Sequence, residues 1–292
     1  MATVLDAWQT EAVGNPLFLF VRKLANVKKA LKLWNSEVFG PIHLKLSVSK
    51  KELEDAQSRL QQLPTDPIYI AEEADARSTY LSLLSQEEKF ARQKSRQLWL
   101  TAGDSNTKFF YNSIKSRSVM NSISRLRRED NSLCSDPEEI KSLIVQYYQN
   151  LLNREATSDL QLPPPPGLVS PTENLALCSP VSEKELRSVI FGLKALSSPG
   201  PDGFPARFFQ LLWDLIKLDL LQAINHFFLN GKLLRQVNHS FIALIPKTLN
   251  ADSLDLYRPI SLCNTLYKII TRIMALRIQP LLPKLVSKHQ SA

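Results

Sequence analysis

The chain has 292 residues, of which 44% are hydrophobic, and it carries 36 lysine and arginine residues against 28 aspartate and glutamate residues. That apolar content is enough for one or two domains with sizeable cores and excludes a wholly disordered chain. No apolar run approaches the ~20 residues of a membrane-spanning helix and no secretory leader is recognisable, so we expect an intracellular chain, nuclear or cytosolic, without membrane contact. The net charge of +8 favours an anionic partner such as nucleic acid.

Motifs for cofactors and metals are missing from this sequence. It contains no glycine-rich phosphate loop and no pair of histidines or cysteines at metal-binding spacing, so we expect neither a resident cofactor nor a metal site. Cys134, Cys178 and Cys263 are widely separated, which predicts reduced, buried thiols. Asp252 and Asp255 form the nearest approach to a carboxylate pair in the second half, and we interpret them as solvated loop residues.

The first 100 residues predict long helices. Apolar residues alternate at spacings of three and four over 17–34, and a second helical pattern runs from the break at Gly40-Pro41 to residue 63. The turn at 64–67 precedes a highly charged helical pattern over 68–99. Either an antiparallel helical hairpin or a three-helix assembly would bury these apolar seams.

The positive charge is concentrated in two segments. Residues 89–128 hold ten basic side chains against a single acid, and six basic residues follow Asp255 without any acid. Aromatic residues are interleaved with the first segment, which favours single-stranded nucleic acid because bases can stack where phosphates are held. An ordinary solvated helix face is the alternative. The candidate RNA contacts in this segment are Arg96, Lys108, Lys115, Arg117 and Arg125.

A run of four prolines at 163–166 marks the predicted domain boundary. It divides the chain into a helical, basic region (1–160), a proline-rich linker (161–175) and a second domain (176–292). In the second domain, Ser182 and Glu185 predict a capping box at a helix start, and Gly231 predicts a helix end. Two short apolar runs, 241–245 and 260–263, predict an antiparallel strand pair, after which Asn264 is expected to cap a last helix. The predicted fold class is therefore α+β and mainly α.

Two features of the second domain suggest contacts with a polynucleotide. The turn at 198–204 contains Gly200, Asp202 and Gly203, and its expected exposed amides suit a sugar-phosphate chain, although an ordinary turn is the simpler interpretation. Lys247 ends the first predicted strand and Arg258 begins the second. Across a hairpin the two cations could converge on a triphosphate, whereas edge-strand cations alone often only prevent aggregation.

These strings resemble the reverse transcriptases of LINE-type, non-LTR retrotransposons, most closely the copies abundant in flowering plants. The resemblance covers nearly the whole chain. It is carried in the first half by KLWN (32–35), VFG (38–40), SRQLWL (95–100) and GDSNTKFF (103–110), and in the second half by PGPDG (199–203), LIPK (244–247), YRPISLCN (257–264) and YKII (267–270).

The resemblance implies that 176–292 form an incomplete fingers subdomain. In that family the glycine-rich turn lies near template RNA, and the lysine and arginine that match Lys247 and Arg258 contact the incoming nucleotide. The family's palm aspartates, which hold two metal ions, have no counterpart in this sequence, so we expect no catalytic residues and no metal ligands, with Mg²⁺ needed only by an intact polymerase. The expected partner is RNA template or an RNA/DNA hybrid; deoxynucleotide triphosphate would bind only if a palm were supplied, and no obligate protein partner is inferred.

Three interpretations remain open from the sequence. The chain is a polymerase fragment that keeps its RNA-facing surfaces and lacks catalysis, or a non-enzymatic nucleic-acid-binding or helical scaffold protein derived from a decayed element. The third interpretation is complementation, in which another chain supplies the palm.

Overall fold

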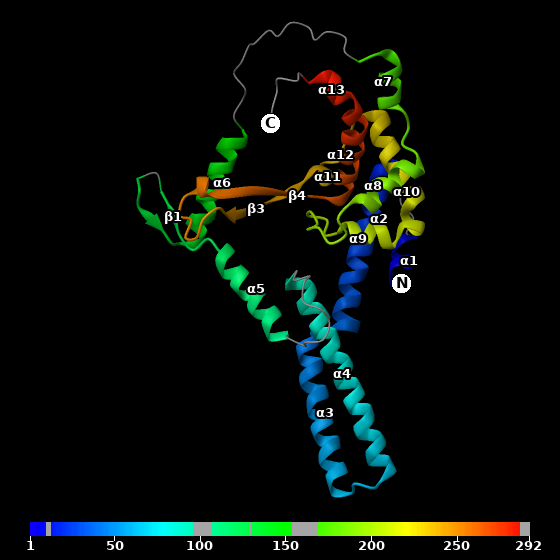
Figure 1. Cartoon of the computed structure of the whole chain (residues 1–292), viewed down its shortest axis with the longest axis vertical. Helices are drawn as coiled ribbons and strands as arrows, with labels where there is room; N and C mark the ends of the chain where they lie inside the picture. The colour runs from blue at the N-terminus through cyan, green and yellow to red at the C-terminus, as the bar shows by residue number, and fades with distance from the viewer. Residues whose placement is uncertain (10–12, 96–106, 129, 154–168, 287–292) are drawn as a thin grey trace. The chain divides into compact units, whose positions relative to one another are not determined.

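A computed structural model describes residues 1–9, 13–95, 107–128, 130–153 and 169–286 of the chain (Figure 1). The described part is mainly helical and contains two small antiparallel sheets of two strands each, which confirms the predicted α+β class. None of its helices combines the length and apolarity needed to cross a bilayer. The proline run at 163–166 lies outside the described residues.

The chain divides into two units that are not the predicted domains. Unit 1 contains residues 1–31 and 125–292, and unit 2 contains residues 32–124. The reason for the difference is α2 (Pro16–Trp34), whose buried residues Leu17, Phe20 and Leu24 belong to the same core as the helices of the second half. Residues 171–175, which the sequence assigns to the linker, begin a helix instead.

Unit 1 is built around helices from both ends of the sequence. Besides α2 its helices are α1 (Ala2–Trp8), α6 (Pro137–Leu152), α7 (Pro171–Cys178), α8 (Glu183–Gly192), α9 (Ala206–Leu211), α10 (Trp213–Asn230), α11 (Arg235–Asn238), α12 (Thr265–Ile278) and α13 (Leu282–Leu285), with 3₁₀ turns η2 (Leu254–Leu256) and η3 (Gln279–Leu281). The core lies between α2, α8, α10 and α12. Its largest fully buried side chains include Phe20, Leu186, Ile190, Phe209, Ile216, Leu220, Ile224, Leu266 and Ile269.

The structure confirms the predicted helix ends in part. The Ser182 hydroxyl accepts a hydrogen bond from the Glu185 amide (3.2 Å), but the Glu185 carboxylate turns to Arg277 on α12 in a bidentate pair, with both distances 2.8 Å. A complete capping box forms instead at Ser170 and Glu173, at the start of α7. Gly231 ends α10 in the left-handed conformation, as predicted (φ 64°).

The predicted strand pair is present as β3 (Ser240–Pro246) and β4 (Tyr257–Cys263). Its register places Ala243 opposite Ile260 and Ile245 opposite Arg258. Figure 1 shows the ribbon running from the helical core of unit 1 to β1 (Leu126–Arg127) and α6. Apolar side chains of the ribbon stay exposed, such as Phe241 at 59%, because along much of the strands no other described element covers them.

A second, shorter strand pair was not predicted. Strand β1 pairs with β2 (Leu133–Cys134), and two residues a strand give too little sequence for a period-two pattern to be recognised. Cys134 is buried there, as predicted for all three thiols, whereas Cys178 is exposed and Cys263 is half-buried. The prediction of a buried thiol is thus wrong for Cys178.

Unit 2 is a helical hairpin with one further helix. Helix α3 (Ile42–Gln62) packs antiparallel to α4 (Pro67–Ser95), and α5 (Thr107–Asn121) packs against α4. A π-helical turn, η1 (Asn35–Phe39), precedes α3. Of the two predicted arrangements, the hairpin is present, because α2 buries its seam in unit 1.

A candidate nucleic-acid interface

Helix α5 carries the centre of the basic segment and is held firmly within unit 2. Phe110 is buried, and the Tyr111 hydroxyl lies 3.4 Å from Nε2 of His43 on α3. His43 in turn pairs with Glu87 of α4 (2.9 Å), and burial together with Glu87 raises the pKa of Tyr111. The Arg117 guanidinium donates to the main-chain oxygen of Ser95 (2.6 Å), which ties α5 to the end of α4.

The five predicted RNA-contacting cations are therefore not equivalent. Lys108 and Lys115 are exposed and lie seven residues apart on α5, which places them on the same face two turns apart. Arg117 is exposed but donates to Ser95, and Arg125 is exposed at the start of the second segment of unit 1. Arg96 lies outside the described residues.

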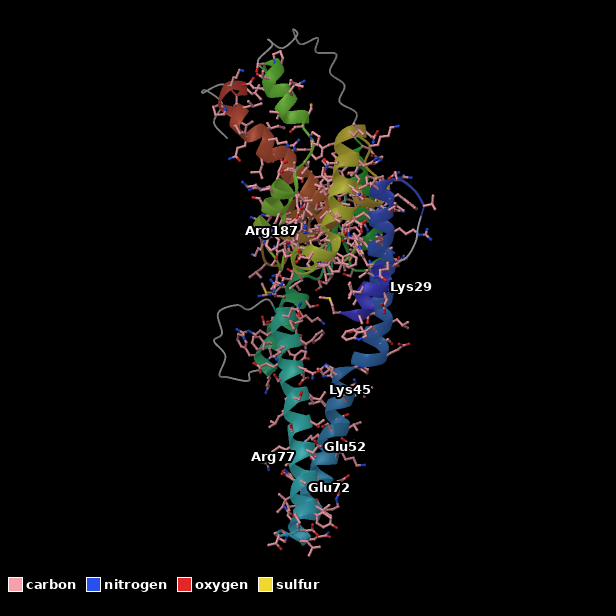
Figure 2. The ribbon with its side chains drawn as sticks, turned by 90° about the vertical axis from the view of Figure 1, so that its right-hand side faces the viewer. Lys29, Lys45, Glu52, Glu72, Arg77 and Arg187 are labelled. Atoms are coloured by element: carbon pink, nitrogen blue, oxygen red, sulfur yellow. The ribbon has the colours of Figure 1, made fainter. Side chains whose placement is uncertain are left out.

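Charge is segregated within the α3–α4 hairpin. Residues 50–88 contain nine acidic and four basic side chains, whereas the segment that follows is strongly basic. Figure 2 shows Glu52 and Glu72 on this hairpin together with Arg77, whose guanidinium pairs with the buried Glu73 carboxylate at 2.6 Å. A polyanion would be repelled by this acidic section and attracted by the basic residues on α5.

Two further cations of the basic segment are neutralised by ion pairs. Arg127 pairs with Asp252 (2.6 Å), and its amide donates to the Asp252 carbonyl at the same distance, so β1 is attached to the loop between β3 and β4. Arg128 forms a bidentate pair with Glu139 of α6, with distances of 2.5 and 2.9 Å. The guanidinium lowers the pKa of Glu139 to about 2. Asp252 is thus a partner of an arginine, not a free loop residue.

The glycine-rich turn packs tightly on the start of α12. Gly200 is buried, and a Cβ built there would lie 2.4 Å from the Asn264 nitrogen and 2.5 Å from the Cys263 carbonyl carbon. Only glycine fits at this separation. The Gly203 amide donates to the Gly200 carbonyl (3.0 Å), and Gly203 itself has a φ of 84°.

The amides of this turn are already used inside the protein, contrary to the expected exposure. The Asp202 amide donates to Oδ1 of Asn264 (3.0 Å), and the Phe204 amide donates to Oδ1 of Asp202 (3.1 Å). Burial raises the pKa of the Asp202 carboxyl, while Lys28 and Lys268 oppose that rise. Contacts with a polynucleotide at this turn would therefore involve side chains and carbonyl oxygens more than these amides.

Asn264 is a central residue that sequence reasoning placed in a different role. Its side chain does not cap α12; its amide nitrogen donates to the carbonyls of Gln236 (2.9 Å) and Val237 (3.1 Å), while its oxygen receives the Asp202 amide. Thr265 donates to the Phe204 carbonyl (2.6 Å), so the turn is also held from the first residue of α12. The YRPISLCN string contained Asn264, but only the tertiary structure shows what it bonds.

Lys247 and Arg258 lie at the same end of the β3–β4 ribbon. Arg258 is opposite Ile245, and Lys247 directly follows the end of β3, where its amide donates to the Leu256 carbonyl (2.8 Å). The Lys247 ammonium donates to the Asp255 carbonyl (2.6 Å), whereas Arg258 is exposed. The structure thus places both side chains near the outer end of the ribbon.

Two hollows in the described part of unit 1 lie beside residues of the candidate interface. One, of about 510 Å³, lies between β1, α6 and the loop at 253–255. The other, of about 340 Å³, lies between α2, the glycine-rich turn and the start of α12, and Lys28 and Asp202 contribute to its lining. The described residues contain no group of three or more histidine, cysteine, aspartate or glutamate side chains arranged to hold a metal ion.

Comparison with known proteins gives one informative similarity. No protein-family model matches the chain. The chain is 26% identical, over 299 aligned positions, to a Xenopus laevis protein described as "Transposon TX1 uncharacterized 149 kDa protein". The chain is similar to a transposon protein. The alignment covers 99% of this chain and 23% of that protein, which supports derivation of the chain from a transposable element.

Proposed function

We propose that this chain is the linker and fingers portion of a non-LTR retrotransposon reverse transcriptase of the type found in flowering plants, and that it binds RNA template or an RNA/DNA hybrid. Similarity to a transposon protein along almost the whole chain supports the element-derived origin. The match of the PGPDG, LIPK and YRPISLCN strings supports the fingers assignment. Deoxynucleotide binding by Lys247 and Arg258, together with Mg²⁺, belongs to the intact polymerase with its palm.

The observation that carries the binding proposal is the state of the cations on α5. Lys108 and Lys115 are exposed on one helix face, and among the described residues neither forms an ion pair or a side-chain hydrogen bond. Arg127 and Arg128, by contrast, are already paired with carboxylates. Free ammonium groups release counterions from a polynucleotide when they bind it, whereas a paired arginine gains much less.

A salt titration of RNA binding tests this proposal. The full chain should bind a labelled single-stranded RNA in fluorescence anisotropy, with log affinity falling linearly as log salt rises. Lys108→Ala together with Lys115→Ala should reduce that slope by about 1.4, since each phosphate contact on a single strand contributes ~0.7. Lys50→Ala with Lys51→Ala makes the same charge change within the acidic hairpin and should leave the slope unaltered.

The result separates the proposal from its alternative. Equal salt slopes of RNA binding for the two double variants would indicate that α5 is an ordinary solvated helix. Failure of the unmodified chain to bind RNA at low salt would favour the helical scaffold interpretation.

A further inference from the structure

The hollow of about 510 Å³ in unit 1 joins two parts of the chain that are more than 100 residues apart. We name it the α6 hollow; its lining includes Arg127 of β1, Leu143, Gln146, Tyr147 and Asn150 of α6, and Leu254 of η2. The bond from the Arg127 amide to the Asp252 carbonyl and the ion pair between the same residues fix its two walls together. The walls of the hollow are therefore held in place by the fold, and its volume of about 510 Å³ is large enough for a nucleobase.

Tyr147 presents a rigid aromatic surface to this hollow. It is 38% exposed, and its ring stands edge-on against the buried Tyr148 at 5.1 Å between centroids and 84° between planes. That T-shaped contact orients the ring, and the exposed fraction leaves part of it open to solvent. An aromatic ring held in this way is a stacking platform for any base, because every base has a π-face.

Amide side chains flank the platform. Gln146 and Asn150 are four residues apart on α6, so they are neighbours on one helix face, and both are exposed. Within the described part of the chain neither amide has a hydrogen-bond partner. Each offers a donor and an acceptor, the combination that pairs with the edge of an unpaired base.

The charges around the hollow favour a base over a phosphate inside it. Arg127 and Arg128 are neutralised by Asp252 and Glu139, so their guanidinium planes are held in place with little net charge. Lys247 is not part of the lining; its ammonium donates to the carbonyl of Asp255, which is a lining residue. The Asp255 carboxylate in the lining would repel a phosphate, so a base would lie in the interior and its phosphate would remain at the rim.

We propose that the α6 hollow binds one unpaired nucleobase of a single-stranded nucleic acid, stacked on Tyr147 and contacted at its edge by Gln146 and Asn150. This inference rests on the proposed RNA binding and adds a base-recognition site separate from the cations of α5. A peptide with an apolar side chain is the competing occupant, given the leucines in the lining.

Binding measurements on matched strands test the inference. With the full chain, Tyr147→Ala should weaken binding to a single-stranded RNA by about tenfold, the order of magnitude for one lost base stack. Binding to a blunt duplex should be unchanged, because its bases are not available. Tyr147→Phe keeps the ring and should bind as the unmodified chain does, and Tyr69→Ala, at the start of α4, is the control for loss of a tyrosine elsewhere.

The salt slope distinguishes this site from the α5 cations. Tyr147→Ala removes no phosphate contact, so its slope should equal that of the unmodified chain while its affinity is lower. A strand that contains abasic sites should bind the unmodified chain more weakly than an intact strand of equal charge. That comparison needs no variant, so it remains decisive even if Tyr147→Ala fails to fold.

The outcomes overturn different statements. No RNA binding by the unmodified chain would remove the proposed function together with this inference. Binding with the expected α5 slope but with equal affinity for intact and abasic strands would overturn the base site alone. An equal loss of affinity for single strands and for duplexes in a folded Tyr147→Ala variant would also overturn the base site. So would protection of α6 from hydrogen exchange by an apolar peptide when RNA gives no such protection.

Discussion

Replacement of Gly200 by alanine should destabilise unit 1 far more than the addition of one methyl group suggests. The new methyl carbon would lie 2.4 Å from the Asn264 nitrogen, 2.5 Å from the Cys263 carbonyl carbon and 2.6 Å from Oδ1 of Asn264. Two of these atoms are main-chain atoms, and the third is held through the same side chain that donates to Val237. The turn must therefore move away from α12, because no flexible side chain can give way.

The size of the effect follows from two contributions. Forcing a methyl group into a packed site costs about 1–3 kcal/mol. Separation of the turn from α12 also breaks the hydrogen bond from the Asp202 amide to Asn264, which contributes ~1 kcal/mol. We therefore expect a loss of about 2–4 kcal/mol in the free energy of unfolding, which for a unit of this size lowers the midpoint by on the order of 10 °C.

Tryptophan fluorescence during thermal or urea unfolding measures this loss. Trp8 and Trp213 are both buried in the core of unit 1, so their emission reports its unfolding. Gly192→Ala is the matched control, since it lies at the end of α8 with no atom within 4 Å of the new methyl group and should be neutral or slightly stabilising. Equal midpoints for the two variants would refute the close approach of the turn to α12.

Three further predictions concern the core, the ion pair on α12 and catalysis. Phe20→Ala should lower the free energy of unfolding measured in urea by about 3–5 kcal/mol, because Phe20 is fully buried in the shared core. A small decrease would mean that α2 does not belong to unit 1. Arg277 lowers the pKa of Glu185, so this pair stabilises the fold above about pH 4.3 and its contribution fades as the pH falls through the lowered pKa. Arg277→Gln should therefore be less stable than the unmodified chain at pH 7, and the difference in stability should narrow as the pH falls through the lowered pKa of Glu185; a difference independent of pH would contradict the assignment. The chain should not extend a primer on an RNA template with Mg²⁺ or Mn²⁺, because its sequence contains no Tyr-x-Asp-Asp turn to hold the two metal ions, and template-dependent incorporation by the purified chain would overturn the fragment interpretation.

The local elements were accessible from the sequence because local forces determine them. The spacing of apolar residues predicts α2, and Gly231 ends α10 in the left-handed conformation for which glycine has no steric cost. The two apolar runs predict the β3–β4 ribbon, whose observed register puts Arg258 opposite Ile245, two residues before Lys247. Each of these features depends on residues that are near one another in the chain.

Tertiary structure alone decided which cations form ion pairs within the described part of the chain and which chain segments share a core. The sequence counts Lys108 and Arg127 equally, but Arg127 meets Asp252 only after a separation of 125 residues is closed. Likewise α2 has one apolar seam that could be buried against any apolar partner. Only the packed structure shows that its partners are α8, α10 and α12. The same is true of Gly200. Composition predicts a turn, but glycine is required because the folded protein brings main-chain atoms of Cys263 and Asn264 within 2.6 Å of the position that a Cβ would occupy.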